Sequence, residues 1–293
     1  MFNFKPQKGK AYENLPTKEV DKFDKNQYLV STKYDGNQIF IVKKDKTVRY
    51  FTSDWKEFDI PHLSDQLLSN ESDFILIGEF MYGCEGKLGD RGKSAIITTW
   101  RTNFAKGKDN MYDPAKVNIR VFDCLLFNNN GLFCDNYKAE YRLVIASLLS
   151  LPENIKVVSR FLMSGAEAKV KAKRLVAQGW EGVMCIDPHS AYRFDKRVNY
   201  AVKLKYRKTA DLLCIDYIDG EGKYHNMIGS LILKDKAGRI VAVGSGLDDV
   251  SRQKDISCYL NKVIEIEYEQ IIDTYIQPTF IQVREDKQAK DID

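Results

Sequence analysis

The feature that most constrains this chain is a lysine at the junction of two apolar, β-leaning runs. The hexapeptide KYDGNQ at 33–38 lies between YLVST at 28–32 and IFIV at 39–42. Such runs separated by Asp-Gly predict a strand, a tight turn and a second strand. Gly36 can adopt a positive φ without steric cost, and Asp35 can hydrogen-bond back to the turn backbone. The turn should therefore hold the Lys33 amine near the end of a sheet.

A lysine amine at such a place can act as a nucleophile once it is deprotonated. Its ordinary pKa of about 10.4 must then be depressed by burial or by neighbouring cations. Most lysines beside a hairpin turn are solvated surface residues, so a K-x-D-G tetrapeptide alone is weak evidence and the rest of the chain has to decide.

Length and composition bound the class of protein. The 293 residues suffice for one large domain or two smaller ones. No run of about eighteen apolar residues is present, and the N-terminus lacks an apolar signal-peptide core, which predicts a cytoplasmic protein without a membrane span. The six cysteines, at 84, 124, 134, 185, 214 and 258, include no C-x-x-C pair. This spacing argues against a zinc site and favours a reducing compartment.

The net charge of +4 is unevenly distributed. Residues 1–207 hold 34 Lys and Arg against 25 Asp and Glu, a formal charge of +9, whereas residues 208–293 hold 11 against 16, or −5. A basic larger part favours a polyanionic partner, although solvated surface charge explains it too.

Periodicity divides the first part into alternating elements. Residues 1–27 predict an irregular basic arm, 28–53 three strands joined by turns, and 84–116 a long irregular loop. An acid stands in or beside three predicted strands: Glu79 in 74–83, Asp123 in 119–127, and Glu181 at the start of 181–187. A carboxylate inside an apolar strand is costly unless it is paired or binds a cation. Further elements are expected at 61–70, 138–151 and 164–180 (helices) and at 155–162 and 200–207 (strands).

From Lys208 onward the pattern is all-β. Five short strands within some eighty residues are separated by Gly, Asn and Asp, which predicts a small barrel of the OB type. The fold class is therefore α+β: a domain of antiparallel sheets with flanking helices at 1–207, followed by a small OB-fold domain at 208–293.

Six short motifs occur in a fixed order: KYDG, GEF, FDCLLF, EGVM, KLK and, at 284–287, REDK. This series resembles the covalent nucleotidyltransferase superfamily, and within it the small viral or phage ATP-dependent DNA ligases. The resemblance covers residues 28–287. It implies an adenylylation domain, a mobile OB domain hinged near Arg207 to Thr209, and the sealing of nicks in double-stranded DNA through a lysyl-AMP, by a monomer that uses ATP and Mg²⁺.

The resemblance also implies roles for individual residues. Lys33 would be the nucleophile, Lys203 and Lys205 would contact the α-phosphate and depress the pKa of Lys33, and Phe122 would stack on adenine. Glu79 and Glu181 would hold the ribose and the metal. The remaining expected site residues are Ser31, Thr32, Asp35, Gly36 and Gln38 at the nucleotide and Arg284, Asp286 and Lys287 at the pyrophosphate.

Three positions depart from the family's usual pattern. Gln38 and Asp54 stand where arginines are common, and Ser31 stands where an acid often meets adenine. Arg49, Arg91 or Arg101 could supply the missing positive charge toward the 5′-phosphate of the nick. NAD-dependent relatives need an additional N-terminal domain, and 32 residues precede Lys33, so ATP is the expected nucleotide.

Two rival interpretations remain open. An RNA ligase or a capping guanylyltransferase shares K-x-D-G and K-x-K, although REDK on an OB barrel favours DNA ligase. A non-enzymatic nucleic-acid-binding protein could use the basic arm and an OB platform with stacked aromatics. That protein would bind in a salt-sensitive manner, but it leaves the Lys33 turn and Glu79 without a role.

Overall fold

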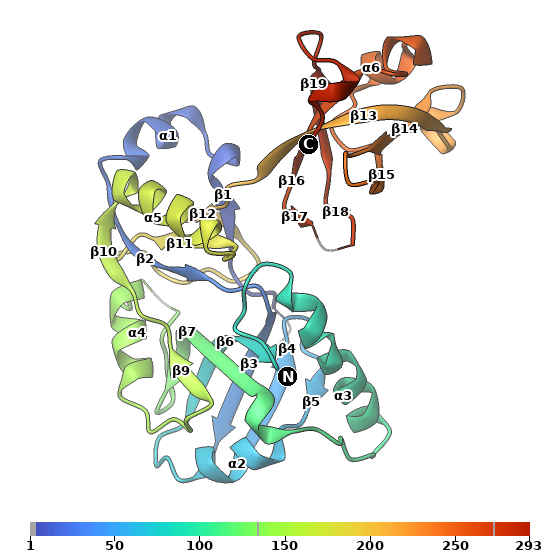
Figure 1. Ribbon diagram of the computed structural model, residues 1–293. Coiled ribbons are helices and arrows are strands. Elements are labelled where there is room, and N and C mark those ends of the chain that lie inside the picture. The colour runs from blue at the N-terminus through green and yellow to red at the C-terminus, as the bar shows by residue number, and fades with distance from the viewer. Residues whose placement is uncertain (1–3, 134, 272) are drawn as a thin grey trace. The chain divides into compact units, whose positions relative to one another are not determined.

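The computed structural model describes residues 4–133, 135–271 and 273–293, with the backbone alone at residues 93 and 94. Cys134 lies outside the described residues, and the other five cysteines are free thiols. The chain divides into two compact units, Met1–Tyr206 and Arg207–Asp293, which are drawn in Figure 1. Among the described residues, no helix has the length and apolar character needed to cross a membrane.

The first unit is built on two sheets. One has the order β5-β4-β3-β6-β7-β8, with β9 paired to β7, and the other has the order β1-β12-β11-β2-β10. The first sheet consists of β3 (Asn37–Lys44), β4 (Thr47–Thr52), β5 (Glu57–Phe58), β6 (Phe74–Tyr82), β7 (Val117–Phe127), β8 (Asn130–Gly131) and β9 (Ile155–Val157). The second consists of β1 (Lys8–Ala11), β2 (Gln27–Lys33), β10 (Phe161–Ser164), β11 (Gly182–Ile186) and β12 (Arg197–Leu204).

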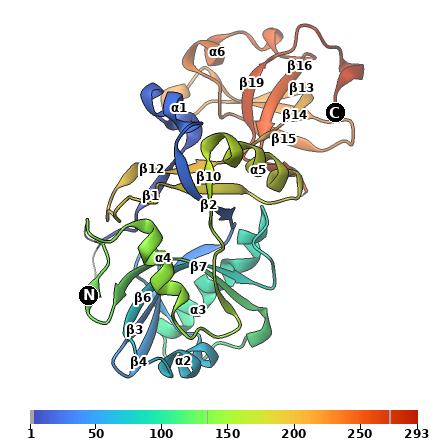
Figure 2. The same cartoon turned by 90° about the vertical axis from the view of Figure 1, so that its left-hand side faces the viewer.

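Helices cover these sheets. The larger sheet carries α2 (Pro61–Leu68), α3 (Ile96–Ala105) and α4 (Ala139–Ser147), whereas α1 (Thr17–Phe23) and α5 (Gly165–Ala177) lie on the smaller one, as Figures 1 and 2 show. Ser164 caps α5 through a capping box with Glu167, as its sequence position predicts. Apolar side chains of the helices and of the inner sheet faces form the cores.

The KYDG turn connects the two sheets. It leads from β2 in the smaller sheet to β3 in the larger one, so it is not a hairpin within one sheet. Gly36 does not adopt a positive φ. Glycine is needed there because a Cβ would lie 2.4 Å from the Phe80 carbonyl oxygen. The expectation of a conformational role for Gly36 is therefore wrong, and close packing replaces it.

Three expected elements differ in the structure. The arm at 1–27 contains β1, which pairs in parallel with β12, and helix α1. The loop at 84–116 contains α3, whose Ile97 and Trp100 are buried. Its run of β-branched residues disfavours helix locally, and burial of the apolar face overrides that preference. The strand at 155–162 is two strands in different sheets, so the chain crosses between the sheets again at 158–160.

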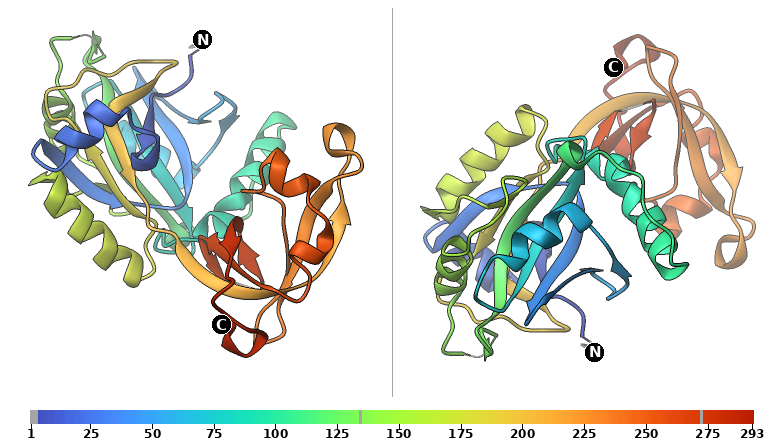
Figure 3. Two further views of the ribbon diagram at one scale, coloured as in Figure 1. Left: turned by 90° about the horizontal axis from the view of Figure 1, so that it is seen from above. Right: turned by 90° about the horizontal axis from the view of Figure 1, so that it is seen from below.

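The second unit is an antiparallel five-stranded sheet with the order β15-β14-β13-β16-β19. Its strands are β13 (Lys208–Asp219), β14 (Ile228–Lys234), β15 (Ile240–Val243), β16 (Val263–Tyr268) and β19 (Thr279–Val283), accompanied by α6 (Asp249–Gln253) and the short pair β17 (Gln270–Ile271) and β18 (Tyr275–Ile276). Figure 3 shows β13 as a long, curved strand. An apolar core fills this unit.

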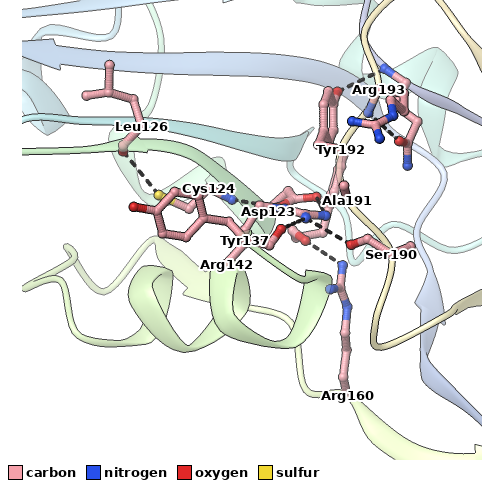
Figure 4. A network of polar contacts seen from close by, with 12 residues as sticks. Asp123, Cys124, Leu126, Tyr137, Arg142, Arg160, Ser190, Ala191, Tyr192 and Arg193 are labelled. Atoms are coloured by element: carbon pink, nitrogen blue, oxygen red, sulfur yellow. Dashed lines mark hydrogen bonds and ion pairs between the residues drawn. The ribbon is translucent and has the colours of Figure 1, made fainter. Parts of the chain in front are cut away.

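A buried ion pair fastens α4 to β7 (Figure 4). The Arg142 guanidinium donates to both Asp123 oxygens, at 2.7 and 3.2 Å, and to the carbonyls of Tyr137 and Ser190. Arg142 is 1% and Asp123 5% exposed. Since every oxygen of the pair has donors, the acid in the FDCLLF strand is compensated inside the protein.

Removing one partner of this pair should be costly. We expect Arg142→Leu to lower the free energy of unfolding by about 3–5 kcal/mol, because Asp123 is left buried and unpaired. The double variant Asp123→Leu/Arg142→Leu should recover most of that loss. Urea unfolding followed by tryptophan fluorescence measures this directly, since all three tryptophans belong to the first unit. Equal losses in the single and double variants would contradict it.

Candidate active site

A cleft of about 900 Å³ lies in the first unit, where the two sheets meet. It is lined by the eleven first-unit residues that the resemblance assigns to the nucleotide, the α-phosphate and the metal: Ser31, Thr32, Lys33, Asp35, Gly36, Gln38, Glu79, Phe122, Glu181, Lys203 and Lys205. Residues separated by up to 174 positions are thus brought to one cavity. The structure establishes this gathering, and the chemical role of each residue remains a prediction.

Glu181 is the centre of the cluster. Its carboxylate is 6% exposed and pairs with the Lys33 ammonium through one oxygen and with the Lys205 ammonium through the other. The register makes this contact possible, because Lys33 on β2 faces Gly182 on β11. A Cβ at Gly182 would lie 2.0 Å from the Leu204 carbonyl, so glycine lets β12 bring Lys205 to the same carboxylate.

The turn after Lys33 is held by groups on both sides. The Gly36 N–H donates to Glu79 Oε1 at 3.1 Å. Asp35 accepts from the Gly89 N–H at 2.7 Å, and its own N–H donates to the Gly86 carbonyl at 2.9 Å. The sequence suggested that Asp35 would bond to the turn backbone. Instead, Asp35 connects the 86–89 segment to the turn. The result is a fixed backbone next to the Lys33 amine.

Glu79 is a half-buried carboxylate without full compensation. Burial raises its pKa to about 7, against the opposing effects of Lys33 and of the Gly36 N–H. A divalent cation would offset the cost of ionising it, and carboxylates are the ligands that Mg²⁺ prefers. The residues present thus fit a metal near Glu79, although Glu181 is engaged by two lysines. Among the described residues, no group of three His, Cys, Asp or Glu is arranged to hold a metal.

Lys203 adds a third ammonium to the cluster. Its pKa is lowered, first by burial and then by the positive charges of Lys33, Arg197 and Lys205. Three lysines facing one fully engaged carboxylate leave an excess of positive charge in the cleft. Such an excess favours a polyphosphate or another anion.

The apolar wall of the cleft includes Phe122, Val158, Met184 and Ile186. Arg160 also lines it, and sequence reasoning did not single it out. Its Nη2 donates to the Phe122 carbonyl. Its Nε and Nη1 are shielded from solvent and have no hydrogen-bond partner among the described residues. Burial accordingly lowers the pKa of Arg160 to about 10. No periodicity marks it, because it lies in the crossing between β9 and β10.

The positions that depart from the family pattern can now be compared with the candidate cations. Asp54 accepts from Thr52 and lies 3.3 Å from the Lys56 ammonium and 4.0 Å from the Arg101 guanidinium. Arg49 pairs with Glu57 at 2.6 Å and is not among the residues that line the cleft. Arg91 and Arg101 do line it, so the structure favours these two over Arg49 as contacts for a phosphate.

The three remaining candidates lie in the second unit. The Arg284 guanidinium pairs with Asp286 at 2.7 Å. The hydrogen bonds from Arg284 stabilise the ionised carboxylate, so the pKa of Asp286 is lowered to about 2. Arg284 and Lys287 both contact Asp211, which the sequence did not mark.

Comparisons with known proteins assign both units to described families. The ATP dependent DNA ligase domain matches residues 6–205, and the DNA ligase OB-like domain matches residues 219–284.

Individual relatives are also DNA ligases. Those of Methanococcus aeolicus and fowlpox virus are each 25% identical over 228 residues, covering 74% and 71% of this chain. The one of Methanosphaerula palustris is 26% identical over 301 residues and 91% of this chain. The chain spans 40%, 38% and 52% of the lengths of these three proteins.

Solved structures share the fold. The structure named Pmar-Lig_PreS3 has a TM-score of 0.72 at 19% identity and covers 96% of this chain and 68% of its own. A structure from a study of DNA binding by Lig E DNA ligases has a TM-score of 0.67 at 20% identity, covering 97% of this chain and 100% of its own.

The raised pKa of Glu79 predicts a pH-dependent stability in metal-free protein. The folded state binds more protons than the unfolded state between pH 4.5 and about 7, so stability should fall as pH rises through that window. Glu79→Gln should therefore be more stable than wild type above pH 7, by up to roughly 3 kcal/mol, and match it below pH 4.5.

Thermal unfolding in EDTA across this pH range tests the expectation. Glu85→Gln, at a carboxylate that is 71% exposed, is the control and should follow wild type at every pH. A stability difference for Glu79→Gln that does not change with pH would contradict the expectation.

Proposed function

This chain belongs to the family of ATP-dependent DNA ligases, and we propose that it seals nicks in duplex DNA by way of a lysyl-AMP. The observation that carries the proposal is the cluster around Glu181. It places the ammonium of Lys33 beside two further lysines in a cleft large enough for a nucleotide. A binding module would not need a lysine held this way at the junction of two sheets.

The reaction has three steps. The Lys33 Nζ, once deprotonated, attacks the α-phosphorus of ATP; a P–N bond forms and pyrophosphate leaves. The 5′-phosphate of the nick then attacks the same phosphorus, which breaks the P–N bond and transfers AMP to the DNA. In the last step the 3′-hydroxyl attacks the 5′-phosphorus, a phosphodiester forms and AMP leaves.

The residues of the cleft suit this chemistry. Phosphoryl transfer depends on positioning and on stabilising negative charge that is already spread over phosphate oxygens. Lys203 and Lys205 would meet the α-phosphate, and Glu181, in direct contact with Lys33, orients the amine and can accept a proton from it. Phe122, on β7 of the larger sheet, would pack against the adenine ring, and Ser31 and Thr32, on β2 of the smaller sheet, line the same cleft.

We further propose Mg²⁺ as the metal, held by Glu79 and, once a lysine has been released, by Glu181. When bound, it would neutralise phosphate charge during the transfer. Arg284, Asp286 and Lys287 would orient the departing pyrophosphate, and Arg91 and Arg101 would hold the nick 5′-phosphate in place of the arginines absent at 38 and 54. The protein would act in the cytoplasm as a monomer.

The direct test is incubation with Mg²⁺ and α-labelled ATP, followed by a denaturing gel. We expect a labelled band at 33.7 kDa that disappears when nicked duplex DNA is added, because the AMP moves to the DNA. Lys33→Ala should form no band, whereas Lys18→Ala, at a lysine that does not line the cleft, should behave as wild type. Labelling by GTP instead of ATP would indicate a capping enzyme, and sealing of nicked RNA alone would indicate an RNA ligase.

Arg284 offers a step-specific prediction. Arg284→Ala should lose lysyl-AMP formation while still sealing nicks that already carry a 5′-adenylate, because pyrophosphate takes part in the first step alone. Single-turnover assays of the two steps measure this, with Lys290→Ala as the control at an exposed lysine of the same unit. Equal losses in both steps would exclude a specific role at the pyrophosphate.

A further inference from the structure

We propose that Asp211 is the positioning residue that sets the directions of Arg284 and Lys287, an inference that rests on the proposed ligase function. Asp211 lies on β13, more than seventy residues away from both cations in sequence. Its carboxylate is buried, at 7% exposure, and it contacts both side chains directly. A buried acid at this place has no assigned role in the reaction itself.

The sheet register explains how the contact is built. Asp211 on β13 faces Glu265 on β16, and Glu265 in turn faces Gln282 on β19. Directly opposed residues share one face of a sheet, so these three form a polar row across it. Gln282 donates to Glu265 at 2.7 Å, and the Arg284 guanidinium lies 3.3 Å from Asp211 and 3.8 Å from Glu265. Arg284 thus extends back along the row.

The backbone places Lys287 beside the same acid. The Arg284 N–H donates to the Val263 carbonyl at 2.8 Å, which anchors the start of the segment. The Lys287 N–H donates to the Arg284 carbonyl at 3.1 Å, closing a four-residue turn that brings the two cations to one side. The Lys287 ammonium then pairs with Asp211, and Asp293 accepts from the Asp211 N–H at 2.7 Å. The C-terminal segment therefore closes around Asp211.

Burial decides which acid controls the orientation. Asp286 also pairs with Arg284, but its side chain is 65% exposed. Exposed ion pairs contribute little, whereas a buried carboxylate that loses its partners is strongly destabilised. Arg and Lys side chains have many rotamers, and ordering them before the substrate arrives removes part of the entropic cost of binding. Asp211 is buried and contacts both cations, so it can order both side chains.

The test is Asp211→Asn, which removes the charge and keeps the shape. We expect lysyl-AMP formation at saturating ATP to slow by about tenfold to a hundredfold, since misplaced groups lose that order of rate. Sealing of pre-adenylylated nicks should be unchanged. Asp219→Asn, at an exposed acid at the end of the same strand, is the matched control and should behave as wild type in both steps.

A double-variant cycle separates positioning from stability. If Asp211 acts through the two cations, adding Asp211→Asn to Arg284→Ala/Lys287→Ala should slow the residual lysyl-AMP formation, followed over long incubations, no further. The proposal would be overturned if Asp211→Asn slowed lysyl-AMP formation by the same factor with and without the two alanine substitutions. It would also be overturned if Asp211→Asn alone slowed both steps equally, or left the rate of the first step equal to or above that of wild type. Wild type that forms no lysyl-AMP at all would instead overturn the proposed function, so the two failures are distinguishable.

Discussion

The Glu181 carboxylate is the interaction on which the rest of the first unit depends. Strand β2 ends at Lys33, β11 begins at Gly182 and β12 ends at Leu204, and the bonds from Glu181 to Lys33 and Lys205 join these strand ends. The buried Glu181 carboxylate is tolerated because two ammonium groups compensate its charge. Those ammonium groups stay in place because separating them from the buried carboxylate would cost on the order of 3–5 kcal/mol of stability. The nucleophile proposed here is therefore oriented by the folded protein before any nucleotide binds.

The same physical device occurs in both units. Glu181 holds two lysines in the first unit, and Asp211 holds Arg284 and Lys287 in the second. Each carboxylate is buried, Glu181 directly before β11 and Asp211 on β13, and each pairs with two flexible cations. Glu79 represents the opposite situation, because its raised pKa reflects a charge that Lys33 and the Gly36 N–H compensate only in part. Preorganised cations and one partly compensated acid are what a polyphosphate bound with a divalent metal requires.

Much of this could be predicted from the sequence, because strongly apolar strands carrying a single acid or lysine are conspicuous. Prediction from the local sequence pattern was wrong where contacts between residues distant in the sequence determine the secondary structure. Helix α3 forms from β-branched residues because Ile97 and Trp100 are buried, and β1 forms because β12 offers it an edge. The run at 155–162 reads as one strand, yet its halves join different sheets and leave Arg160 at the cleft wall. The local sequence does not distinguish Asp211 from other acids in strands. Its contacts with Arg284 and Lys287 depend on the three-dimensional structure.

We infer that Lys33, and not Lys203 or Lys205, carries the nucleotide. Peptide mapping by mass spectrometry after incubation with ATP and Mg²⁺, under conditions that preserve phosphoramidates, tests it most directly. We expect the mass of one AMP on the peptide that contains Lys33, and its loss after nicked DNA is added. An adduct on Lys203 or Lys205, or a stable adduct that DNA does not remove, would contradict it.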